Sequence, residues 1–137
     1  MRVGLPKEIK NHEYRVGLVP ASVRELVSRG HEVWVETQAG SGIGCGDEDY
    51  RQAGARIAPD AATIFDSGQL IIKVKEPQLS ECKQLRADQT LFTFLHLAAD
   101  RDQAEALMAA GVTAIAYETV TANDGSLPLL APMSEVA

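Results

Sequence analysis

Three side chains of this sequence are of the types that could act together on a small acid: Arg15, Lys75 and His96. A planar guanidinium can hold a carboxylate through two parallel charge-assisted hydrogen bonds. A lysine ammonium can hold a carboxylate or polarise a carbonyl, and a histidine is the usual proton carrier near neutral pH. Together the three types fit a site for a 2-oxo or 2-amino acid that combines charge stabilisation with proton transfer.

Other interpretations of these side chains stay open when each is taken alone. The arginine and the lysine could be solvated surface charges, and the histidine could be a core or loop residue held by a hydrogen bond. Lys73 shares a strand face with Lys75 and is the weaker candidate, because it lies further inside an apolar run. Neither Glu118 nor Glu135 has a partner for a carboxylate pair, and no nucleophilic triad is visible.

The segments before Lys75 and His96 predict two strands that end at these residues. Residues 70–75 form an apolar run that Pro77 closes, because proline cannot continue a ladder and holds its predecessor extended. Residues 91–95 form a second such run. In open parallel sheets ligands bind at the carboxyl edge, so both side chains are expected at that edge.

The remaining elements alternate between strands and helices. Arg15 is expected in a polar loop at 7–16 that follows a strand at 2–5. Further strands are expected at 31–36, 55–58 and 112–117, and helices at 20–29, 48–53, 61–65, 80–85, 102–110 and 132–137. Alternation with nearly all-apolar strands predicts an α/β fold: a mostly parallel sheet with helices on both faces.

A glycine-rich segment at 40–46 imitates a phosphate-binding loop but fits one poorly. The GxGxxG spacing would place its last glycine where Cys45 or Asp47 stands. The three acids at 47–49 would also repel a pyrophosphate, whereas they suit the positive N-terminus of a following helix. We therefore expect a flexible loop and not a nucleotide site.

Composition restricts the class of protein further. The 137 residues suit one domain, and a net charge of −6 argues against a nucleic-acid partner. Cys45 and Cys82 lack metal-ligand spacing, so no metal is expected, and their number suits a reducing compartment. No signal peptide and no run of about 20 apolar residues is visible, so we expect a cytoplasmic protein without a membrane partner.

Six motifs, in order and without gaps, resemble the N-terminal half of bacterial NAD-dependent alanine dehydrogenases. They are GLPKEIK (4–10), EYRV (13–16), KVKEP (73–77), FTFLHLA (92–98), AYET (116–119) and LPLLAPMSE (127–135). The resemblance implies a Rossmann-like or flavodoxin-like substrate domain from which the nucleotide-binding domain is absent. It also fits the last residues, which read as a helix that has only begun.

The resemblance also implies an activity and the roles of particular residues. Members of the family interconvert L-alanine with pyruvate and ammonia, use NAD, and usually assemble as hexamers. Arg15 and Lys75 would bind the substrate carboxylate and carbonyl, His96 would transfer a proton, and Ser134 would contact the cofactor. Without its nucleotide domain, the 137-residue chain alone is expected to be inactive.

Two alternative functions stay open. The N-terminus of the proton-translocating NAD(P) transhydrogenase alpha subunit is similar, but the presence of both Lys75 and His96 favours the alanine enzyme. The other alternative is a non-catalytic fragment that binds a small acid.

Overall fold

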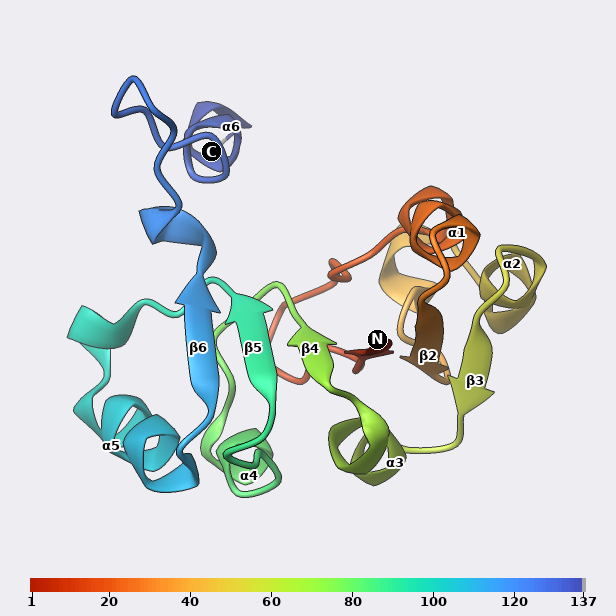
Figure 1. The fold of residues 1–137 in the computed structure, drawn as a ribbon, viewed down its shortest axis with the longest axis horizontal. Helices are drawn as coiled ribbons and strands as arrows, with labels where there is room; N and C mark the ends of the chain where they lie inside the picture. Colours follow the sequence, from red (N-terminus) through yellow and green to blue (C-terminus); the bar gives the residue numbers. More distant parts are fainter. Residues whose placement is uncertain (137) are drawn as a thin grey trace.

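The structure is a computed structural model that describes residues 1–136, and it contains a six-stranded sheet in which every pairing is parallel. The strands are β1 (Arg2–Leu5), β2 (Glu32–Glu36), β3 (Arg56–Ala58), β4 (Leu70–Ile72), β5 (Thr90–Thr93) and β6 (Thr113–Ala116). Their order across the sheet is β3-β2-β1-β4-β5-β6 (Figure 1). This is the doubly wound arrangement, in which the chain winds outward in both directions from the middle of the sheet.

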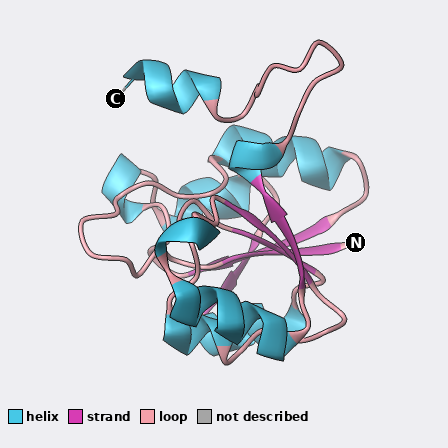
Figure 2. Cartoon of the chain, turned by 90° about the vertical axis from the view of Figure 1, so that its left-hand side faces the viewer, coloured by secondary structure: helices cyan, strands magenta, loops and turns pink. Residues whose placement is uncertain are grey.

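Two groups of helices pack on the sheet, as expected. The helices are α1 (Pro20–Ser28), α2 (Asp47–Gln52), α3 (Ala61–Ser67), α4 (Leu79–Cys82), α5 (Arg101–Ala110) and α6 (Ala131–Val136). One core cluster joins α1 and α2 to β1 and β2, and the other joins α3, α4 and α5 to β4 and β5 (Figures 1 and 2). The predicted α/β class with helices on both faces is therefore confirmed.

Local chemistry sets several of the helix ends that the sequence predicted. Asp60 caps α3 by accepting the backbone N–H of Thr63 at 2.8 Å. Asp100 caps α5 in the same way, through Gln103 at 3.1 Å. Such side-chain oxygens bind N–H groups that have no partner within the first helical turn.

β4 and β5 end two or more residues earlier than predicted, and in both a carboxylate binds backbone N–H groups just beyond the strand end. β4 ends at Ile72, so Lys75 lies beyond the strand and is not its last residue. Lys73 still donates to Phe92 of β5, and the Glu8 carboxylate then accepts the N–H groups of Val74 and Lys75. β5 ends at Thr93, and Glu118 accepts the N–H of Leu95. Apolar patterning cannot reveal this, because the competing acceptors come from distant segments.

The glycine-rich segment forms a turn that contacts another loop, and the glycine at position 42 is required by this contact. Residues Ser41–Ile43 form a single 3-10 turn against the polar loop that follows β1. A Cβ on Gly42 would lie 2.3 Å from the carbonyl oxygen of Tyr14, which is too close for any side chain. Close backbone approach explains this glycine without a nucleotide.

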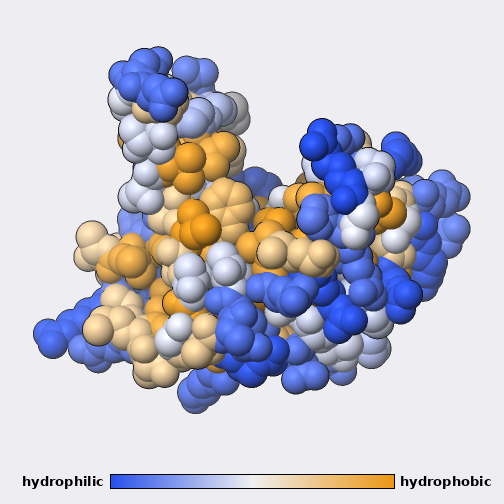
Figure 3. Space-filling model, viewed as in Figure 1, coloured by the Kyte–Doolittle hydropathy of each residue, from blue (hydrophilic) through white to orange (hydrophobic). Residues whose placement is uncertain are grey.

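The half of the sheet formed by β4, β5 and β6 is less completely covered. Apolar side chains gather there, and α6 stands away from the sheet (Figures 1 and 3). In β6, Ile115 is 43% exposed. Within residues 1–136, no helix is long and apolar enough to cross a membrane.

Candidate functional site

The candidate site lies where the winding of the sheet reverses, between β1 and β4. These two strands pair directly, but the chain continues from β1 towards β2 and from β4 towards β5. The chain therefore leaves the two strands towards opposite halves of the sheet, and the carboxyl edge at such a point is where ligands bind in these folds. The segment after β1 carries Glu8, Glu13 and Arg15, and the segment after β4 carries Lys73 and Lys75.

A buried ionic cluster forms the floor of this region. The ammonium of Lys73 lies 2.9 Å from the Glu8 carboxylate and 3.1 Å from that of Glu81, which belongs to α4. The three side chains are only 1%, 2% and 4% exposed. A charge so deeply buried is tolerated only when it is paired, so the cluster is expected to hold β1, β4 and α4 together.

The charges of the cluster do not balance, because two carboxylates share one ammonium. Burial raises the pKa of Glu81, and the negative charge of Glu8 adds to this effect, while Lys73 opposes it. Lys73 is thus enclosed between its two partners, and a ligand could reach it only by displacing one of them. From the sequence, Lys73 was a weaker candidate than Lys75, and its pairing with Glu8 and Glu81 was not predicted.

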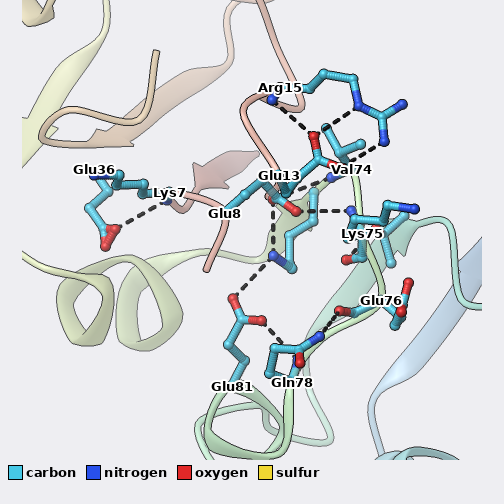
Figure 4. Close-up of polar contacts among 12 residues, drawn as sticks. Lys7, Glu8, Glu13, Arg15, Glu36, Val74, Lys75, Glu76, Gln78 and Glu81 are labelled. Carbon is cyan, nitrogen blue, oxygen red and sulfur yellow. Dashed lines mark hydrogen bonds and ion pairs between the residues drawn. The ribbon is translucent and has the colours of Figure 1, made fainter. Parts of the chain in front are cut away.

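Glu8 also fixes the backbone that carries Lys75. Its Oε1 accepts the N–H of Lys75 at 2.9 Å, and its Oε2 accepts the N–H of Val74 at 3.3 Å (Figure 4). The side chain of Lys75 itself is partly exposed, and among residues 1–136 no ion pair involves its ammonium. The backbone of Lys75 is therefore fixed, while its ammonium remains open to a ligand.

Arg15 and Lys75 both lower the pKa of Glu13, and Arg15 is already bound to this carboxylate. Its Nε and Nη2 donate to the two oxygens of Glu13 at 2.9 and 2.7 Å, and its backbone N–H donates to the same carboxylate at 2.9 Å. The hydrogen bond from Arg15 lowers the pKa of Glu13, and the charge of Lys75 lowers it further. One edge of the guanidinium is thus occupied, so a substrate carboxylate can use only its remaining N–H groups, a restriction that the sequence did not reveal.

A cavity of about 290 Å³ opens beside this arginine. It is lined by residues that include Lys7, Glu8, Glu13, Tyr14, Arg15 and Ser41. A small organic acid fits such a volume, whereas a dinucleotide does not. Arg15 supplies a cation at its wall.

His96 lies at the neighbouring strand end and is exposed. The segments after β4 and β5 run side by side, because Phe94 donates to the carbonyl of Val74 at 3.2 Å and Thr93 Oγ1 donates to that of Lys75 at 3.0 Å. The backbone of His96 is left-handed, with φ 49° and ψ 40°, which is uncommon for a residue other than glycine. Among residues 1–136, no hydrogen bond joins its ring to Arg15 or Lys75.

Glu118 is a further residue that the sequence did not assign to the site. It belongs to a 3-10 turn after β6 (Tyr117–Thr119), and its Oε1 accepts the N–H groups of Leu95 and His96 at 3.0 and 3.1 Å. Nothing in the sequence indicated this role, because the partners of Glu118 are backbone groups and not a second carboxylate.

The last candidate, Ser134, lies on α6 and is exposed. Its neighbour Met133 lines an apolar cavity of about 340 Å³ with Phe92 of β5, Phe94 just after β5 and Tyr117 of the turn after β6. Within the described part of the chain, no cluster of three or more acidic, histidine or cysteine side chains could hold a metal ion.

Fold and site together define a doubly wound α/β domain with a small pocket, lined by both basic and acidic side chains, near its switch point. Comparison with known proteins gives the family. Residues 4–137 match the family described as "Alanine dehydrogenase/PNT, N-terminal domain", and the chain belongs to this family.

Individual relatives agree with this assignment. An alanine dehydrogenase of Halomonas elongata is 57% identical over 137 residues, which are the whole of this chain and 37% of that protein. A solved L-alanine dehydrogenase superposes with a TM-score of 0.96 at 56% identity, over 100% of this chain and 38% of its own. A transhydrogenase from Sinorhizobium meliloti gives a TM-score of 0.80 at 30% identity, over 86% of this chain and 35% of its own. The chain thus spans little more than a third of the length of the relatives it matches.

Proposed function

We propose that this chain is the N-terminal, substrate-binding part of an alanine dehydrogenase, which converts L-alanine, NAD⁺ and water to pyruvate, ammonium, NADH and a proton. The observation that carries the proposal is the position of Arg15 and Lys75 at the switch point of a chain that is similar throughout to alanine dehydrogenases. Arg15 lines a small cavity that suits a carboxylate, and the charge of Lys75 acts on Glu13, which lines the same cavity. A lone surface charge would not need this arrangement.

Each side chain has a distinct role in the proposed reaction. The free N–H groups of Arg15 bind the substrate carboxylate, and Lys75 binds the carboxylate or the carbonyl oxygen of pyruvate. His96 takes or gives the proton that moves when the carbonyl forms or is attacked. NAD, when bound, supplies the hydride chemistry, and orientation of the reactants is the contribution of the protein.

The cofactor and the assembly belong to the same proposal. NAD would be held mainly by a second domain that lies outside these 137 residues, with the exposed hydroxyl of Ser134 facing it. We further propose a cytoplasmic enzyme that assembles as a hexamer when full length. The two free thiols, Cys45 and Cys82, suit a reducing compartment.

The proposal is tested by an assay of the full-length protein beside its first 137 residues. NADH oxidation is measured spectrophotometrically with pyruvate and ammonium together and with each omitted. Oxidation by the full-length protein that requires both substrates is expected, with none from the 137-residue part. Activity of the short part, or no activity of the full-length protein, would contradict the proposal.

A transhydrogenase subunit is the second candidate, because a transhydrogenase is also similar in fold and sequence. It would pass hydride between two nicotinamide nucleotides without pyruvate or ammonium. The same preparation, given NADH and an oxidised nucleotide analogue, separates the two functions. A non-catalytic fragment would show neither reaction but would still bind pyruvate in a calorimetric titration.

A further inference from the structure

The left-handed backbone at His96 is an unusual feature that its surroundings must maintain. Residues other than glycine rarely adopt positive φ, and such a conformation persists only where neighbouring groups enforce it. At φ 49° and ψ 40°, His96 turns the chain sharply just after β5. The direction in which its imidazole leaves the sheet therefore depends on whatever holds this turn.

Two side chains from different elements hold the turn. On one side, Glu118 accepts the N–H of Leu95 with Oε1 at 3.0 Å and Oε2 at 3.3 Å, and the N–H of His96 with Oε1 at 3.1 Å. On the other side, Gln103 of α5 donates its amide to the carbonyl of Leu95 at 3.0 Å and is only 1% exposed. Both peptide groups that flank Leu95 are thus bound by side chains and not by a neighbouring strand.

We propose that Glu118 is a positioning residue that fixes His96 in its left-handed conformation and thereby aims the imidazole at the substrate. The proposal rests on the proposed function only for the role of His96 in proton transfer. Glu118 binds the backbone of His96, and none of its hydrogen bonds within the described residues reaches the imidazole. It therefore acts through His96 and does not itself transfer a proton.

A double-mutant cycle on the full-length protein tests this dependence. Glu118→Ala leaves two backbone N–H groups without their acceptor, so the turn relaxes and the imidazole is displaced. Because misplacement by about 1 Å can cost about 10²-fold, we expect kcat to fall roughly 10- to 100-fold. In a protein that already carries His96→Ala, the same change should lower kcat by no more than about threefold, since residues that act as a unit are not additive.

A matched control is Asp60→Ala, which also removes a carboxylate that binds a backbone N–H, but at the start of α3. Its kcat should stay within about twofold of the wild type. If Glu118→Ala does not fold, the cycle is run with Glu118→Gln, which keeps one acceptor oxygen and should lower kcat about 3- to 10-fold. An unchanged kcat in the folded Glu118 variant, or a further loss of tenfold or more in the His96→Ala background, would overturn the proposal.

A second measurement does not depend on activity. Hydrogen exchange by mass spectrometry should show faster exchange at residues 95 and 96 in the Glu118 variant and no change there in Asp60→Ala. Slow exchange in the Glu118 variant would overturn the positioning role even if the protein catalysed another reaction. Faster exchange in a protein without alanine dehydrogenase activity would support the positioning role and reject the proposed function alone.

Discussion

Just beyond both β4 and β5, a glutamate carboxylate binds two backbone N–H groups, but the two glutamates differ in burial. At β4, Glu8 accepts the N–H groups of Val74 and Lys75, and at β5, Glu118 accepts those of Leu95 and His96. Glu8 is almost completely buried and also pairs with a lysine, whereas Glu118 lies partly exposed and binds only backbone groups in the described structure.

This difference separates stability from function. In the buried surroundings of β4 a charge without a partner is costly, so changes there should chiefly affect folding. At the end of β5, Glu118 is partly exposed and its loss leaves no buried charge without a partner, so changes there should chiefly affect the aim of one side chain.

His96→Ala, at the end of β5, should strongly lower kcat with little effect on stability. Because general acid–base catalysis is typically worth about 10²- to 10⁴-fold, kcat of the full-length enzyme should fall by that factor. The side chain is exposed, so the free energy of unfolding should change by less than about 0.5 kcal/mol. Steady-state kinetics and urea denaturation measure the two effects, and a large loss of stability would contradict the comparison.

Lys73→Met, in the buried cluster after β4, should have the opposite effect and chiefly lower stability. It leaves Glu8 and Glu81 facing each other in the core without a cation, and breaking such a buried pair typically costs about 3–5 kcal/mol. Urea denaturation should show this loss, while Lys83→Met, at an exposed position, should change stability by less than about 0.5 kcal/mol.

The buried cluster gives a second test of the same explanation. If the unpaired carboxylates cause the loss, adding Glu8→Gln and Glu81→Gln to Lys73→Met should recover a large part of it, since no buried charge then remains. A triple variant that is no more stable than Lys73→Met alone would show that shape, and not charge, holds β1, β4 and α4 together.

Arg15→Lys should affect substrate binding more than either stability or turnover. The charge stays, but the planar group that binds Glu13 and the substrate at once is lost, so KM for pyruvate should rise about 10- to 100-fold. Arg29→Lys is the control, because Arg29 forms an exposed pair with Glu25 within one helical turn. A fall in kcat with KM unchanged would show that Arg15 acts only in the transition state.

Glu36→Gln should change how stability depends on pH. Burial raises the pKa of Glu36, so the folded protein keeps this proton to higher pH than the unfolded chain does. The unfolding free energy contributed by this group therefore falls as pH rises from the ordinary glutamate pKa through the folded one. In the variant this fall should be smaller, whereas the exposed Glu25→Gln should leave it unchanged; denaturation at several pH values measures both.

The order of the helices and strands could be predicted from the sequence. The periodic spacing of apolar residues and the residues that begin or end helices were sufficient, because these signals are local. Pro20 begins α1, Asp100 caps α5, and Gly111, at φ 71°, ends α5. The sequence also predicted that Arg15 and Lys75 follow strands whose carboxyl ends meet at one edge of the sheet, and both residues do follow neighbouring strands, β1 and β4.

Only the tertiary structure decided which charged groups are partners. Glu8 and Lys73 are far apart in the chain, as are Glu118 and His96, and nothing in the spacing of these residues signals a contact. A carboxylate that binds backbone N–H groups leaves no mark on the residues it binds, because every residue except proline offers the same group. For this reason the strand ends, the occupied edge of Arg15 and the support of His96 became visible only when distant segments were brought together in space.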